Sequence, residues 1–191
     1  MTTSIKAKYQ KEVIPAMMSE HGYKNVMAIP KIVKVVVNSC FGKEVATKTS
    51  TEREKTVKNV VSDLMLITGQ KPKVAKSKKS IAGFKLRGGL EIGACSTLRK
   101  DKMYAFLERL IYLTLPRSRD FQGLKTKSID KKGNLTIGFK ENISFPEIIT
   151  EKEKTIFGLE VTVVTNAKSK EEGLRLFKLL GFPFKEEKAK V

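Results

Sequence analysis

A lysine-rich stretch punctuated by glycines, residues 69–99, limits most strongly how this chain can fold. Its segment 71–87 carries seven basic residues and no acidic one, so it cannot be buried in an apolar core. Its apolar residues keep neither a helical nor a strand period, and one proline and three glycines interrupt any helix. The pattern predicts a long exposed loop or mobile ribbon over residues 71–90, kept open by repulsion between like charges.

Composition indicates a folded protein that binds a polyanion. The chain has 191 residues, of which 40% are hydrophobic, enough for a substantial core. Its formal net charge is +18, and residues 71–100 alone hold +8 of it. Charge concentrated in this way is typical of proteins that neutralise phosphates. An acidic membrane surface is the rival partner, but the sequence contains no long basic amphipathic helix.

Several classes of function are excluded by the residues that carry chemistry. The N-terminus lacks the apolar region of a signal peptide, and no apolar run is long enough to span a bilayer. Cys40 and Cys95 form no Cys-x-x-Cys pair, and His21 is the sole histidine, so we expect a reducing compartment and no zinc site. The acidic residues fall in helix first turns or beside lysines. We predict no catalytic residue, no metal site and no cofactor.

Hydrophobic spacing predicts the elements of the first half. Four apolar residues at intervals of four predict a first helix: Ile5, Tyr9, Val13 and Met17. Pro15 should bend or end it early. The β-branched run 32–37 predicts a central strand, followed by a turn after Asn38 and a polar connection over 44–49. Thr51 with Glu54 has the pattern of a capping box at the start of a second helix.

The second half predicts further helices and strands. The second helix should end at Gly69, and residues 92–98 should form a strand beyond the basic stretch. An apolar helix over 102–115 should stop at Pro116. Two strands near 126–129 and 135–139 should pair as a hairpin, and a late strand should lie near 159–163. A capping box then predicts a last helix whose capping and inward residues are Ser169, Glu172, Leu174, Phe177 and Leu180.

These elements do not alternate as regular βαβ units, which favours an α+β fold. We predict a two-layer sandwich, with an antiparallel sheet, helices packed on one side and a long basic loop. Residues 1–184 should form a single RNA-binding domain from which the loop 71–90 protrudes, and residues 185–191 a disordered tail. Because Ile81 and Phe84 are interleaved with the lysines, a nucleic-acid contact is favoured over a loop that is merely solvated.

Seven ordered blocks of sequence carry a resemblance to the family of the bacterial large-subunit ribosomal protein L-five, the partner of 5S ribosomal RNA. In chain order they are TGQKPKVAKSKKSIAGFKLR (68–87), STLR (96–99), FLERL (106–110), PRSRDFQGL (116–124), FPEI (145–148), NAKSKEEG (166–173) and FPF (182–184). The resemblance covers almost the whole length. Two departures are Cys40, where the family has a glycine, and the loop exit at 88–91.

The resemblance implies a structural constituent of the large ribosomal subunit, cytoplasmic and not an enzyme. Asn38, Gln70 and Thr97 are implied to bind 5S RNA, because uncharged side chains can hydrogen-bond to ribose hydroxyls and base edges. The basic loop is implied to contact the transfer RNA in the peptidyl site through Lys73, Lys76, Lys78, Lys79, Ser80, Lys85 and Arg87. Further implied partners are 23S-type ribosomal RNA and a small-subunit head protein at an inter-subunit bridge, with no membrane and no homo-oligomer.

Two rival functions follow from the residues themselves. An RNA-processing enzyme would need metal-holding carboxylates, and the sequence has no cluster of acidic residues for them. A non-specific architectural DNA-binding protein would use the same positive charge, and would bind duplex DNA and structured RNA equally at one salt concentration.

Overall fold

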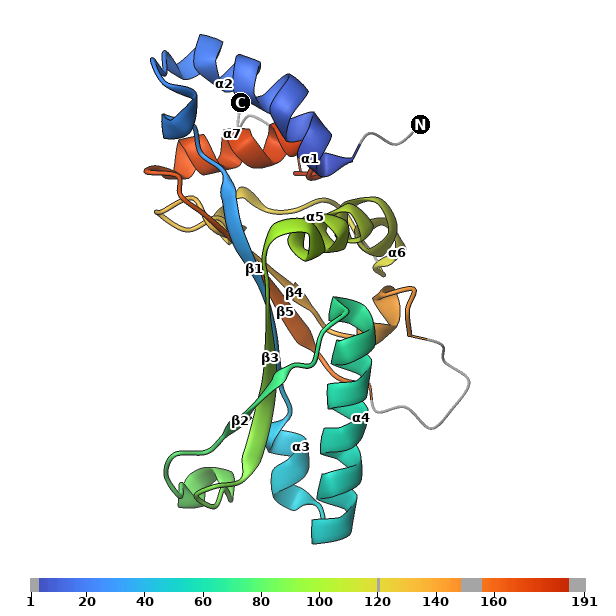
Figure 1. The fold of residues 1–191 in the computed structure, drawn as a ribbon. Helices are drawn as coiled ribbons and strands as arrows, with labels where there is room; N and C mark the ends of the chain where they lie inside the picture. Colours follow the sequence, from blue (N-terminus) through green and yellow to red (C-terminus); the bar gives the residue numbers. More distant parts are fainter. Residues whose placement is uncertain (1–3, 120, 149–155, 186–191) are drawn as a thin grey trace, which may run out of the picture. The chain divides into compact units, whose positions relative to one another are not determined.

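The computed structural model describes residues 4–119, 121–148 and 156–185. Five strands form one antiparallel sheet with helices packed on one side, in the order β2-β3-β1-β5-β4 (Figure 1). The strands are β1 (Ile32–Cys40), β2 (Lys73–Lys76), β3 (Glu91–Leu98), β4 (Leu135–Phe139) and β5 (Leu159–Thr165). The predicted α+β sandwich is confirmed, and with it the predicted central, fourth and late strands.

By internal contacts the chain divides into two compact units. The first contains Met1–Val35, Arg99–Ile137 and Thr162–Val191, and the second contains Val36–Leu98 and Gly138–Val161. Every residue predicted to bind RNA belongs to the second unit. The single domain predicted over 1–184 stays a prediction. The tail predicted over 185–191 lies outside the described residues, except for Lys185.

In the first unit, two helices each contain a wider, π-helical turn. Helices α1 (Ile5–Lys8) and α2 (Ile14–His21) are joined by such a turn, as are α5 (Lys100–Arg109) and α6 (Leu115–Arg117). Each turn ends two residues before a proline, whose ring would clash with the carbonyl four residues earlier in a regular helix. The early ends predicted at Pro15 and Pro116 are therefore wrong, because the helices continue to His21 and Arg117.

The first unit differs from prediction at the expected hairpin. Residues Thr126–Ser128 form a short 3-10 turn, and only Ile129 bridges to Leu135, so the predicted strand near 126–129 is wrong. The physical reason is Asp130, whose carboxylate accepts the backbone N–H groups of Lys132 at 2.9 Å and Asn134 at 2.8 Å. Those bonds lower the pKa of Asp130, against the opposing effect of its desolvation. A side-chain-closed turn takes the place of strand pairing.

The last helix of the first unit, α7 (Lys170–Leu180), begins as predicted. The Ser169 hydroxyl accepts the N–H of Glu172 at 3.2 Å. Two of the predicted inward residues, Phe177 and Leu180, are buried, whereas Leu174 is only half-buried and Leu176 takes its place in the core. Gly173 permits a close approach, because a Cβ there would lie 2.5 Å from the Cα of Gly133.

In the second unit, the long helix α4 (Ser50–Thr68) begins two residues before the predicted position. Its capping box is Thr49 with Glu52, because the Thr49 N–H donates to the Glu52 carboxylate at 3.1 Å. Hydrogen bonds from Thr49 lower the pKa of Glu52. The helix ends at Gly69, whose φ of +66° is left-handed, and this end was predicted.

Helix α3 (Gly42–Thr47) of the second unit was not predicted. The turn and polar connection expected there form a helix because the Phe41 carbonyl accepts the N–H groups of Glu44 at 3.1 Å and Val45 at 3.0 Å. Phe41 and Val45 are buried, so packing holds a segment that its polar composition alone would leave as a loop.

The core of the second unit lies between α4 and one face of the sheet. Alternate strand residues Val37, Ser39, Ala94, Ser96 and Leu98 are buried. On α4, the buried apolar face consists of Val57, Val60, Leu64 and Ile67. Because successive side chains of a strand point to opposite faces, Asn38, Cys40, Cys95 and Thr97 lie on the other side. We call these four residues, together with Lys73 of β2, the open face.

Candidate nucleic-acid interface

The basic stretch begins as a strand at the edge of the sheet. In the antiparallel pairing of β2 with β3, Lys73 lies opposite Cys95 and Ala75 opposite Gly93, with an irregularity before Lys76. The expectation of a loop over all of 71–90 is therefore wrong for Lys73–Lys76, because the backbone of β3 supplies hydrogen-bond partners that no local pattern reveals. Lysines on an edge strand also oppose pairing with another chain, which is a structural use for them.

Beyond β2, the hairpin tip (residues 77–90) is closed by its own hydrogen bonds. The Ser77 N–H donates to the Leu90 carbonyl at 2.7 Å, and the Gly89 N–H donates to the Ser77 carbonyl at 2.8 Å. Further out, Ile81 and Leu86 exchange two backbone hydrogen bonds, of 3.0 and 3.2 Å. The tip thus has a defined backbone from which its basic side chains extend.

Two predicted contact residues of the tip take part in its structure. The Ser80 hydroxyl accepts the Gly88 N–H at 2.9 Å and so links the two sides of the tip. Lys85 has a left-handed φ of 52° at the end of the short turn Ala82–Phe84. Such a conformation is costly for a residue with a side chain and is concentrated at functional sites.

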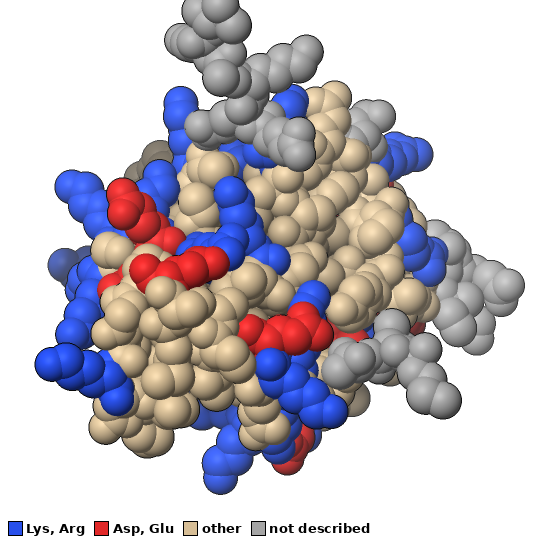
Figure 2. Space-filling model, turned by 90° about the horizontal axis from the view of Figure 1, so that it is seen from above, with Lys and Arg blue, Asp and Glu red and all other residues tan. Residues whose placement is uncertain are grey.

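The charged side chains predicted to contact RNA are all exposed: Lys73, Lys76, Lys78, Lys79, Lys85 and Arg87. The single acidic residue of segment 71–91 is Glu91, which lies 3.6 Å from the Lys76 ammonium. Both side chains are well exposed, so this pair contributes little stability and leaves Lys76 accessible. On the face drawn in Figure 2, basic side chains are also more widespread than acidic ones.

Gln70 and Thr97 are brought together by the fold. Gln70 follows directly after α4 and its Nε2 donates to the Ser96 hydroxyl and to the Thr97 carbonyl, both at 2.9 Å. Its Oε1 accepts no hydrogen bond within the described residues. The side chain is therefore held in place with one acceptor still available. The sequence analysis missed Ser96, although a hydroxyl expected on the buried side of a strand needs a partner.

Asn38 lies on β1, the strand beside β3. The Phe41 N–H donates to the Ile92 carbonyl at 3.0 Å, which joins the end of β1 to the beginning of β3. The Asn38 side chain is exposed, and among the described residues it has no hydrogen-bond partner. Asn38 and Thr97 therefore belong to the same open face on neighbouring strands, and Gln70 is anchored to the backbone of the second of these strands.

The two cysteines also belong to the open face but differ in environment. Cys40 is exposed at the end of β1, while Cys95 is half-buried opposite Lys73. Burial raises the pKa of the Cys95 thiol, and the Lys73 charge opposes that shift. Cys40, the departure noted in the sequence, does not interrupt β1, which includes both Asn38 and Cys40.

Other kinds of site find little support in the described residues. Among them, no group of three or more His, Cys, Asp and Glu is placed to hold a metal ion. In the same part of the chain, none of the helices combines the length and hydrophobicity needed to cross a bilayer. An exposed cationic hairpin beside a face of fixed, uncharged hydrogen-bonding groups defines a nucleic-acid-binding protein of α+β architecture.

Comparisons with known proteins identify the family. Residues 25–87 match the family described as Ribosomal protein L5, and residues 91–184 match the separate description of that ribosomal family's C-terminus. The chain is 49% identical over 177 residues to the large ribosomal subunit protein uL5 of Geobacter sp. strain M21, covering 93% of this chain and 96% of that protein. It is 48% identical over 186 residues to uL5 of Chloroflexus aurantiacus strain J-10-fl, covering 97% and 100%.

The chain belongs to the ribosomal protein L5 family. Membership confirms the predicted class, a structural, RNA-binding ribosomal protein of the large subunit rather than an enzyme. It also confirms the predicted location, the ribosome in the cytoplasm. The individual RNA-binding residues, and the particular RNAs they contact, are a separate question.

Proposed function

We propose that the protein anchors 5S RNA in the large ribosomal subunit through Asn38, Gln70 and Thr97. The observation that carries this proposal is the Gln70 amide, fixed by Ser96 and Thr97 with its Oε1 available, beside the unpartnered amide of Asn38. Preset donors and acceptors of this kind suit ribose hydroxyls and base edges, where sequence and shape are read. Fixing a side chain before binding also reduces the entropy lost on association.

The hairpin serves a different contact in this proposal. Lys73, Lys76, Lys78, Lys79, Lys85 and Arg87 meet the phosphates of the peptidyl-site transfer RNA. Ser80 holds the two sides of the tip together, through its 2.9 Å hydrogen bond from Gly88. Contacts to phosphate carry no sequence information, so a hairpin of this kind accepts every transfer RNA.

Two further partners complete the proposed role. The protein contacts 23S-type ribosomal RNA and, at an inter-subunit bridge, a protein of the small-subunit head. The chain functions there as a single copy, without a homo-oligomer. The 48–49% identity to large-subunit proteins over at least 93% of the chain supports a place in that subunit.

The test is binding of the purified protein to 5S RNA, to an unrelated RNA of equal length and to duplex DNA across a salt series. Phosphate contacts alone give a log-log salt slope of about −0.7 to −0.9 per contact for every ligand. We expect 5S RNA to stay bound at salt concentrations where the other two dissociate, and N38A or Q70A to remove this difference. Equal loss of all three ligands would favour the architectural DNA-binding alternative.

A further inference from the structure

An apolar groove in the second unit separates α3 from the hairpin tip. It has a volume of about 560 Å³, and Ala46 lies on its α3 side and Phe84 and Leu86 on its hairpin side. Exposed Lys43 and Lys85 also line it, whereas no acidic residue does. The groove therefore combines an apolar interior with positive charge contributed from both sides.

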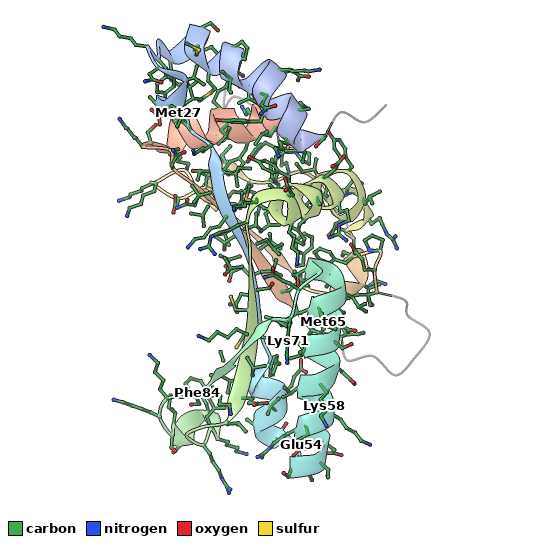
Figure 3. All side chains as sticks on the ribbon, in the orientation of Figure 1. Met27, Glu54, Lys58, Met65, Lys71 and Phe84 are labelled. Carbon is green, nitrogen blue, oxygen red and sulfur yellow. The ribbon has the colours of Figure 1, made fainter. Side chains whose placement is uncertain are left out.

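Phe84 is unusual among the residues that line this groove. Its side chain is 71% exposed, and Figure 3 shows it at the hairpin tip. The backbone beneath it is fixed, because the Phe84 N–H donates to the Ile81 carbonyl at 3.3 Å and the Lys85 N–H donates to the Ala82 carbonyl at 3.0 Å. An aromatic ring displayed to solvent on a rigid turn among lysines is a platform for stacking.

We propose that this groove receives one unpaired nucleobase of a structured RNA. The base stacks on the Phe84 ring, and the phosphates on its two sides meet Lys43 and Lys85. A nucleobase has apolar faces and is attached to an anionic backbone, which matches both properties of the groove. The inference deepens the proposed function, on which it rests, by adding base stacking to a hairpin otherwise assigned phosphate contacts.

The chain contains no tryptophan, so the F84W variant carries a single fluorescent reporter at the proposed site. The probes are an RNA stem-loop with one bulged adenosine and the same stem-loop fully paired. We expect the bulged RNA to quench the fluorescence of F84W strongly and the paired RNA to quench it weakly. The matched control is I81W, because Ile81 is 46% exposed on the same tip but does not line the groove. Both RNAs should affect I81W equally and weakly.

Affinity gives a second measure that does not depend on the reporter. F84A should weaken binding of the bulged RNA by roughly tenfold to a hundredfold and leave its salt slope and the paired RNA unchanged. A46L should cause a similar loss, since it fills the groove without altering charge or Phe84. Equal quenching of F84W by both RNAs, or equal quenching of F84W and I81W, would overturn the inference. Failure of the unmodified protein to bind either RNA would overturn the RNA contact of the hairpin itself, and the inference with it.

Discussion

The open face and the hairpin tip belong to the same compact unit, yet they offer RNA opposite kinds of contact. On the open face and at its edge, Asn38, Gln70 and Thr97 are uncharged, and Gln70 is fixed by two hydrogen bonds of 2.9 Å. On the tip, the backbone is held by hydrogen bonds while the basic side chains extend into solvent. Fixed neutral groups favour selectivity between RNAs, whereas exposed cations favour affinity that falls with salt.

The largest expected effect separates the two regions by charge. Changing Lys76, Lys78 and Lys79 together to alanine should reduce the magnitude of the log-log salt slope for transfer RNA by about 2 to 3, and the affinity about a hundredfold near 0.15 M salt. Affinity for 5S RNA should change little. The measurement is filter binding of both RNAs across a salt series.

A matched control for this triple variant is available in the first unit. Lys125, Lys127 and Lys131 are exposed, and changing them to alanine alters the net charge equally. That variant should keep the transfer-RNA affinity within about threefold, since long-range attraction between exposed charges is screened over about 8 Å at physiological salt. An equal loss in the two triple variants would mean that net charge, not the hairpin, governs binding.

A smaller effect distinguishes the members of the 5S-binding set. N38A and Q70A should each lower affinity for 5S RNA by about tenfold, the equivalent of about 1.4 kcal/mol for one lost contact. Their stabilities should differ, because Gln70 bonds to Ser96 and Thr97 while Asn38 has no protein partner in the described chain.

Urea denaturation should therefore show a loss of about 1 kcal/mol in the free energy of unfolding for Q70A and almost none for N38A. Equal affinity for 5S RNA in both variants and the unmodified protein would remove these two residues from the interface.

A still smaller effect concerns the rigidity of the tip. S80A removes the acceptor for the Gly88 N–H, so the Gly88 amide should exchange with solvent severalfold faster while the free energy of unfolding changes by less than about 1 kcal/mol. Hydrogen exchange followed by NMR measures this directly. The control is S62A on α4, where Ser62 is exposed and its side chain has no partner within the described residues. An unchanged Gly88 rate would show that the Ser80 bond does not hold the tip closed.

The smallest effect uses the two thiols as reporters. Burial raises the pKa of Cys95, so at neutral pH its thiolate fraction is below that of an ordinary thiol and its alkylation should be slower than that of exposed Cys40. The Cys95 rate should rise with pH into the alkaline range, as more thiolate forms. Mass spectrometry of alkylated peptides measures both rates, and faster alkylation of Cys95 would contradict its half-buried position.

The sequence by itself determined the elements whose signals are local. The basic composition of the hairpin, the end of α4 at Gly69 and the start of α7 at Ser169 all follow from residues within a few positions of one another. The alternating pattern likewise fixed β4 at Leu135–Phe139. A family resemblance in seven blocks then supplied the identity of the RNA-binding set, whose members no periodicity singles out.

The tertiary structure decided what depends on distant partners. Gln70 meets Ser96 and Thr97 across 26 and 27 positions of sequence, β2 forms because β3 supplies its pairing, and α3 forms because Phe41 and Val45 are buried. The groove beside Phe84 likewise needs α3 and the hairpin tip together. Local patterns record the preference of a segment, whereas contacts of this kind exist only after long-range pairing and burial have offset the entropy of closing the intervening chain.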